Sequence, residues 1–218
     1  MNKKKLNLKI ILAEAKSFSK IESSVDSVEI YGVTDGKKIG TYLEHKFFHY
    51  LSERYLFQQG NSAIGIDFPE LAIDMKVTSI KQPQSSCPFR SARQKIYGLG
   101  YHLLVFVYEK TDNELEKTGR LKILHTIFVN KELTADFQTT SLIRQIIDNK
   151  GNTDDIEALL RDRNLPIDET GAHVLAEEIL SNPPKQGYLT ISNALQWRLQ
   201  YGRVIKKAGE IDGIEEIS

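Results

Sequence analysis

Residues 65–78 read GIDFPELAIDMKVT, and the rest of the chain is best understood from this stretch outward. From residue 71 onward apolar and polar residues alternate, which predicts a β-strand that buries one face. The core-facing positions of this strand are expected to be Leu71, Ile73, Met75 and Val77. Asp74 and Lys76 then lie side by side on the opposite face.

Asp67 lies just upstream of this strand and is followed by Pro69. A proline interrupts the hydrogen-bond ladder of a sheet and favours a turn. A turn here would fold Asp67 back towards Asp74, so that two carboxylates and the Lys76 ammonium meet at one place. An isolated Asp-x-Lys is common and usually marks only a solvated strand face, so the cluster needs support from elsewhere in the chain.

Composition describes an ordinary globular chain of 218 residues, either one large domain or two smaller lobes. The 29 lysines and arginines balance the 29 aspartates and glutamates, so bulk charge does not argue for a polyanion partner. A local basic cleft is still compatible with this balance. Cys87 is the only cysteine, which excludes an internal disulfide and favours a reducing compartment.

The N-terminal segment is basic, but its apolar run is broken at Lys9 and Glu14, unlike a signal peptide. No stretch reaches the roughly 20 apolar residues of a membrane span. We therefore expect a cytoplasmic protein.

A long helix is predicted over residues 36–55, with Thr34 and Asp35 as N-capping residues. Glu44 falls inside the apolar arc of this helix, where a carboxylate needs a partner. His45 and His49 are one turn apart, a spacing that can hold a metal, but they project to the polar side and are expected to be solvated.

The remaining pattern predicts mixed α/β structure with a central mixed sheet flanked by helices. The apolar run 102–108 is typical of a strand in the middle of a sheet. Further strands are expected at 28–31, 63–67, 121–129 and 187–191, and further helices at 6–19, 91–99, 141–149, 154–163, 169–180 and 194–207. This suggests a core over 1–150 and a mostly helical lobe over 151–218, with a fraying acidic tail from residue 210.

The C-terminal lobe interleaves basic and aromatic residues, a composition that suits contact with nucleic acid. The DNA-contacting candidates there are Lys185, Tyr188, Arg198 and Arg203. A core-packed amphipathic helix with a solvated basic face explains the same pattern, and the alternatives remain open at this point.

Clustering Glu44, Asp67 and Asp74 is electrostatically unfavourable. Two carboxylates about 4 Å apart repel by about 4 kcal/mol at an effective dielectric constant of about 20. Lys76 neutralises one of the three charges, and the remainder matches one hard divalent cation, magnesium or manganese. Such a metal beside a lysine suits phosphoryl chemistry.

The spacing Asp67-x6-Asp74-x-Lys76 fits the PD-(D/E)XK nuclease pattern, and residues 67–76 resemble the active-site segment of MutH-like and type II restriction endonucleases. Residues 38–44 resemble the family's helix that bears an additional glutamate, and residues 187–197 more weakly resemble its C-terminal strand and helix. Two departures from MutH are visible. Position 74 is Asp where MutH has Glu, which the broader pattern permits. The connection from Glu44 to Asp67 is longer than in MutH, and this second departure favours a restriction enzyme over a MutH orthologue.

The resemblance implies a restriction-endonuclease-like core in which Asp67 and Asp74 bind Mg²⁺, with Mn²⁺ as a substitute. It also implies that Lys76 is the catalytic lysine and that Glu44 acts on the metal directly or through water. Lys95 would be a later basic residue near the scissile phosphate. Arg90 and Arg93 would join the C-terminal residues in binding DNA, with the loop 81–90 helping to read sequence.

We therefore expect a magnesium-dependent type II restriction endonuclease that cuts double-stranded DNA and leaves 5′-phosphates. A homodimer suits a palindromic site, although a MutH-like monomer is an alternative. A mismatch-repair nicking enzyme recruited by a partner, and a non-catalytic DNA-binding protein with the same fold, are the competing functions.

Overall fold

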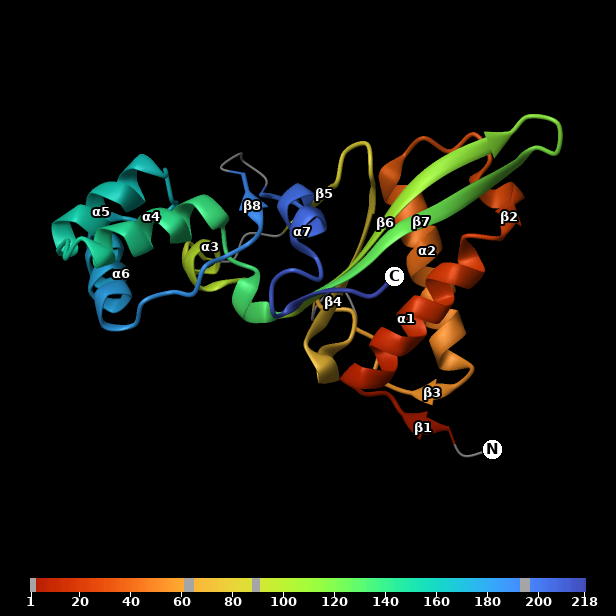
Figure 1. Ribbon diagram of the computed structural model, residues 1–218, viewed down its shortest axis with the longest axis horizontal. Helices are drawn as coiled ribbons and strands as arrows, with labels where there is room; N and C mark the ends of the chain where they lie inside the picture. The colour runs from red at the N-terminus through yellow and green to blue at the C-terminus, as the bar shows by residue number, and fades with distance from the viewer. Residues whose placement is uncertain (1–2, 61–64, 88–90, 193–196) are drawn as a thin grey trace. The chain divides into compact units, whose positions relative to one another are not determined.

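The computed structural model describes residues 3–60, 65–87, 91–192 and 197–218 (Figure 1). The chain forms two compact units that interleave along the sequence. Unit 1 contains Met1–Ser85, His102–Val129 and Lys207–Ser218, and unit 2 contains Ser86–Tyr101 and Asn130–Lys206. Residue 150, where the sequence suggested a boundary, lies inside unit 2. The predicted mixed α/β class is confirmed.

Unit 1 is built on a mixed sheet in the order β10-β7-β6-β4. Strand β4 pairs parallel with β6, and β6 pairs antiparallel with β7. The strands are β4 (Ile73–Ser79), β6 (His102–Asn113), β7 (Thr118–Val129), β10 (Ile214–Glu216) and β2 (Asp26–Ser27), which pairs with β7. The side chains of Leu103 to Val107 are fully buried, as expected for a central strand.

Two helices pack on this sheet, α1 (Leu8–Glu22) against β7 and α2 (Gly36–Ser52) against β4. Figure 1 shows both helices beside the long β6–β7 hairpin. The Asp35 side chain caps α2 by accepting from the Lys37 N–H at 2.8 Å, as predicted. Helix α2 ends earlier than expected because Tyr55 joins β3 (Tyr55–Leu56), which pairs parallel with β1 (Lys4–Lys5).

Two expectations for unit 1 are wrong. The segment 28–31 is not a strand, because Val28–Ile30 forms the 3-10 helix η1 with Ser27 as its cap. The C-terminal tail does not fray. Strand β10 pairs with β7, and Ile217 N–H donates to the Thr126 carbonyl at 2.7 Å. The acidic composition hid the apolar Ile214, which is fully buried.

Unit 2 is mostly helical and has its own apolar core, formed by residues such as Ile96, Ile143, Leu160 and Ile179. Its helices include η3 (Lys131–Leu133), α3 (Arg93–Tyr97), α4 (Phe137–Asp148), α5 (Thr153–Asp162) and α6 (Glu169–Ser181). Strand β5 (Gln84–Ser86) lies where the chain passes from unit 1 to unit 2.

The helix predicted over 194–207 is wrong in its first part. Arg198–Gln200 is strand β9, paired antiparallel with β8 (Thr190–Ile191), and only Gly202–Lys207 is helical (α7). Residues 194–196 lie outside the described part of the chain. Trp197, Leu199 and Tyr201 are buried on every second position, which is strand periodicity. No helix in the described residues is long and apolar enough to cross a membrane.

Candidate active site

The segment before β4 is a tight turn rather than a continuation of the strand. Pro69–Leu71 forms the 3-10 helix η2, and Ala72 adopts a left-handed conformation with φ 50°. The backbones of Phe68 and Ile73 then pair on either side of the turn, with N···O distances of 2.9 and 3.2 Å. Leu71 and Ala72 are therefore outside the strand that was predicted for them. The strand expected over 63–67 is absent from Gly65–Asp67, and residues 63–64 lie outside the described part.

Aromatic packing holds this turn in place. The Phe68 side chain is 1% exposed and lies among Phe47, Phe48 and Phe57, with ring centroids 4.9 to 6.3 Å apart. Gly60 N–H also donates to the Asp67 carbonyl at 2.8 Å, an approach so close that a Cβ at Gly60 would clash with the backbone of Ile66. The backbone on both sides of the Asp67 side chain is thus constrained.

The turn directs the Asp67 carboxylate onto the first residues of β4. Asp67 Oδ2 accepts a hydrogen bond from Met75 N–H at 2.7 Å. The Asp67 and Asp74 carboxyl groups hydrogen-bond to one another. Asp74 is 4% exposed and Asp67 is partly buried, so the two acids meet in a largely dehydrated place.

Burial changes the acidity of both groups. Desolvation raises the pKa of Asp74 to about 6, opposed by the positive charge of Lys76 and reinforced by Asp67. Desolvation also raises the pKa of Asp67, and the nearby Glu44 charge acts in the same direction. Burial thus makes both carboxylates harder to ionise, and because they are in contact they titrate as a pair.

Lys76 provides the positive charge of the cluster. Its Nζ lies 2.7 Å from Asp74 Oδ2, and its side chain is 20% exposed. Because residues 74 and 76 point to the same face of β4, both groups stand on the face opposite Met75, which packs in the core. The structure thus brings Asp67, Asp74 and Lys76 together.

Glu44 is close to this cluster without being a member of the carboxylate pair. It lies on α2, partly buried, and its charge acts on Asp67. Within the described residues, no group of three or more acidic, histidine or cysteine side chains is placed to hold one metal ion. The sequence predicted three carboxylates at one metal site. The structure brings Asp67 and Asp74 together, and Glu44 does not join them.

The chemistry of the pair nevertheless suits a hard divalent cation. Carboxylate oxygens are the ligands that magnesium prefers, and a cation bound to both acids would stabilise their charged forms and relieve their repulsion. The raised pKa values come first from the burial of the two acids; the Asp67 charge adds to the shift of Asp74, and the Glu44 charge adds to that of Asp67.

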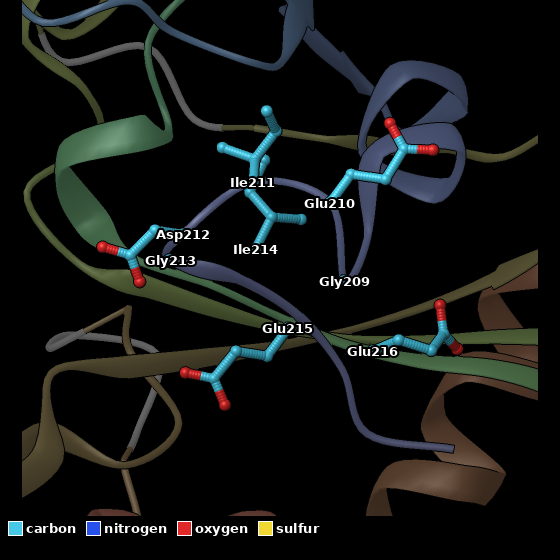
Figure 2. Close-up of a pocket in the computed structure, with 8 residues that line it drawn as sticks. All are labelled: Gly209, Glu210, Ile211, Asp212, Gly213, Ile214, Glu215 and Glu216. Carbon is cyan, nitrogen blue, oxygen red and sulfur yellow. The ribbon is translucent and has the colours of Figure 1, made fainter.

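A second acidic segment lies near the C-terminus, where residues Gly209–Glu216 line a shallow hollow in unit 1 (Figure 2). Figure 2 shows the carboxylates of Glu210, Asp212 and Glu215 pointing away from one another. Their oxygens do not converge, so this segment does not provide a cation site.

Three of the DNA-contacting candidates, Arg93, Lys95 and Lys185, interact with other side chains of the protein. Arg93 forms an ion pair with Glu178, and Lys185 forms one with Glu132. Lys95 is fully buried, its pKa is lowered by burial, and its ammonium faces the Trp197 ring at 5.9 Å. That placement does not fit the expected contact of Lys95 with a phosphate. Arg90 lies outside the described residues.

The candidates near the C-terminus are more accessible. Arg198 is exposed on β9, Tyr188 is partly exposed and packs edge-on against Phe137, and the Arg203 guanidinium stacks on the same ring at 3.6 Å. Gln200 is also exposed on β9, but the sequence analysis did not include it among the DNA-contacting candidates. Apolar and polar residues alternate over residues 197–201, WRLQY, and this strand pattern would have placed Gln200 on the same face as Arg198.

Two comparisons with known proteins match nearly the whole chain to the same kind of enzyme. A family model described as "Type II restriction enzyme NspV" matches residues 5–216. A protein of that name from Nostoc sp. (strain ATCC 29411 / PCC 7524) is 63% identical over 209 residues, covering 96% of this chain and 95% of that protein. No solved structure matches the chain. The matched residues include Asp67, Asp74 and Lys76 as well as strands β8 and β9.

Proposed function

Because the chain belongs to the family of the type II restriction enzyme NspV and cleaves DNA at specific sites, we propose that it does so by magnesium-dependent hydrolysis at Asp67, Asp74 and Lys76. The observation that carries this proposal is the buried Asp67–Asp74 pair with Lys76 Nζ 2.7 Å from Asp74. Two acids that can hold a divalent cation, with a lysine beside them, suit the hydrolysis of a phosphodiester.

Asp67 and Asp74 would hold Mg²⁺, which Mn²⁺ can replace because it accepts the same oxygen ligands. When bound, the ion supplies positive charge for the developing phosphorane and lowers the pKa of a bound water. Glu44 lies outside the carboxylate pair, and its contribution would be its negative charge, which acts on Asp67.

Lys76 orients the attacking water and adds positive charge beside the phosphate. Its ion pair with Asp74 keeps the ammonium on the same face of β4 as the acids. In the reaction, water attacks phosphorus, the bond to the 3′ oxygen breaks, and that oxygen takes up a proton. The products are a 5′-phosphate and a 3′-hydroxyl.

A palindromic DNA site is matched most simply by two copies of the chain related by a two-fold axis. We therefore include a homodimer in the proposal, acting on double-stranded DNA in the cytoplasm. Sedimentation of the protein with and without a cognate duplex measures the number of copies.

The test is cleavage of plasmid DNA with magnesium by the wild type, Asp74→Ala and Lys76→Ala. We expect unaided cutting by the wild type alone and direct ligation of the products without prior phosphorylation, which requires 5′-phosphates. Equal cutting by all three proteins would refute the assigned site. Products that need a kinase before ligation would refute the proposed bond cleavage.

A further inference from the structure

Strands β8 and β9 form an antiparallel pair with one buried and one polar face. Ile191 and Leu199 oppose each other and are 3% and 0% exposed. On the other face Gln200 lies opposite Thr190, and Arg198 lies beside Ser192, to which its backbone N–H donates at 3.1 Å. The polar face therefore carries Arg198 and Gln200, both exposed.

A buried carboxylate fixes the backbone behind this face. Asp136 is 1% exposed, and its Oδ2 accepts from Ile191 N–H at 2.8 Å. Its Oδ1 accepts from the Thr139 N–H and hydroxyl at 2.8 and 2.7 Å, so that one side chain joins β8 to the start of α4. Such anchoring keeps the geometry of a recognition surface constant before DNA binds.

The lack of an acidic partner within the described residues distinguishes Arg198 from Arg93 and Lys185. Arg93 and Lys185 have carboxylate partners in Glu178 and Glu132. Arg198 has no acidic partner among the ion pairs of the described residues and projects from a strand into solvent. Its guanidinium fork is thus available to a ligand.

The spacing of Arg198 and Gln200 along β9 matches the rise between base pairs in DNA. Residues 198 and 200 are about 6.8 Å apart along a strand, roughly two base-pair steps of about 3.4 Å. Neighbouring strands lie about 4.8 Å apart, so the side chains on this face of β8 and β9 span less than the roughly 12 Å width of a major groove. Arginine makes a bidentate contact with guanine, and glutamine makes one with adenine, at the groove edge of each base.

We propose that the polar face of β8 and β9 reads bases in the major groove, with Arg198 contacting a guanine and Gln200 an adenine. The proposal rests on the DNA cleavage function above and adds the surface that selects the site.

The first test compares Arg198→Ala and Gln200→Ala with matched controls, Arg144→Ala and Gln145→Ala. The control residues are the same types, exposed and adjacent on α4. Each protein digests a sequenced phage DNA with magnesium, and the cut ends are sequenced. Each β9 variant should accept other bases at one position of the site and cut the wild-type site about 10- to 100-fold more slowly. The control variants should match the wild type.

The second test measures binding without divalent cation, so its outcome does not depend on the proposed hydrolysis. A duplex carrying the site found for the wild type competes against a duplex with that site scrambled. We expect the wild type and controls to prefer the first duplex and the β9 variants to lose most of that preference, with unchanged melting temperatures. Retention of full preference by Arg198→Ala and Gln200→Ala would overturn the proposal, as would an equal loss in the controls.

Discussion

The Asp67 carboxylate accepts a hydrogen bond from Met75 N–H at 2.7 Å, across a separation of eight residues. The same carboxyl group bonds to Asp74, the neighbour of Met75. One oxygen of Asp67 therefore fastens the turn at Pro69 to β4, and the group as a whole contributes charge to the cluster. These structural and electrostatic roles can be separated by substitution.

Asp67→Asn keeps an oxygen that can accept from Met75 N–H but removes one negative charge. We expect the melting temperature to be retained or raised, because the repulsion between buried acids disappears, while the cleavage rate falls at least about 100-fold. Asp67→Ala should lose both activity and stability, since it also removes the acceptor of the Met75 N–H. An unsatisfied buried N–H lowers the free energy of unfolding by about 1 to 3 kcal/mol. Plasmid cleavage and thermal melting measure the two effects. Equal destabilisation by the two variants would contradict the role of the hydrogen bond.

The raised pKa of Asp74, about 6 in the folded protein, predicts a pH dependence of stability without divalent cation. The folded state holds this proton more tightly than the unfolded state, so the contribution of Asp74 to stability falls as pH rises from about 4 to about 6 and is then constant. The difference corresponds to about 3 kcal/mol. Denaturant unfolding in a chelator at several pH values should show this fall in the wild type, and Asp74→Asn should reduce it. An identical pH profile in the variant would contradict the assignment.

His173 should contribute a loss of stability with rising pH in unit 2, as Asp74 does in unit 1, but in a higher pH range. A hydrogen bond from its ring to Glu157 at 2.6 Å raises the pKa of His173, with the Glu177 charge adding to it. The folded state therefore favours the protonated ring, and this stabilisation is complete below about pH 6.5 and lost as pH rises through the folded pKa. Ring proton shifts followed by NMR should titrate above about pH 6.5, and Glu157→Gln should lower the midpoint. A midpoint unaffected by Glu157→Gln would count against the interaction.

Strand β10 should contribute to the stability of unit 1. Ile214 is fully buried where β10 pairs with β7, whereas Glu215 beside it is exposed. Ile214→Ala should destabilise the protein by about 2 to 5 kcal/mol, and the matched Glu215→Ala should change stability by less than about 0.5 kcal/mol. Denaturant unfolding measures both. Similar small effects of the two substitutions would mean that the tail is not part of the cooperative fold.

The arrangement of the candidate site was largely predictable because its determinants are local. Alternation identified the core-facing residues of β4, Asp35 marked the start of α2, and Pro69 indicated the turn that brings Asp67 to Asp74. Each of these features depends on sequence neighbours within about one turn or one strand, where backbone geometry follows from residue type.

Other features depended on partners far away in the chain. Residues 198–200 form a strand because Thr190 and Ile191 pair with them. The C-terminal tail is ordered at Ile214 because this residue pairs with Val129. Lys95 was expected at a phosphate but is buried in unit 2, where the charge of Asp136 acts on it. Local periodicity records which residues can be buried, but the choice between helix and strand, and the partner of a buried charge, are set by long-range packing that no short window of sequence contains.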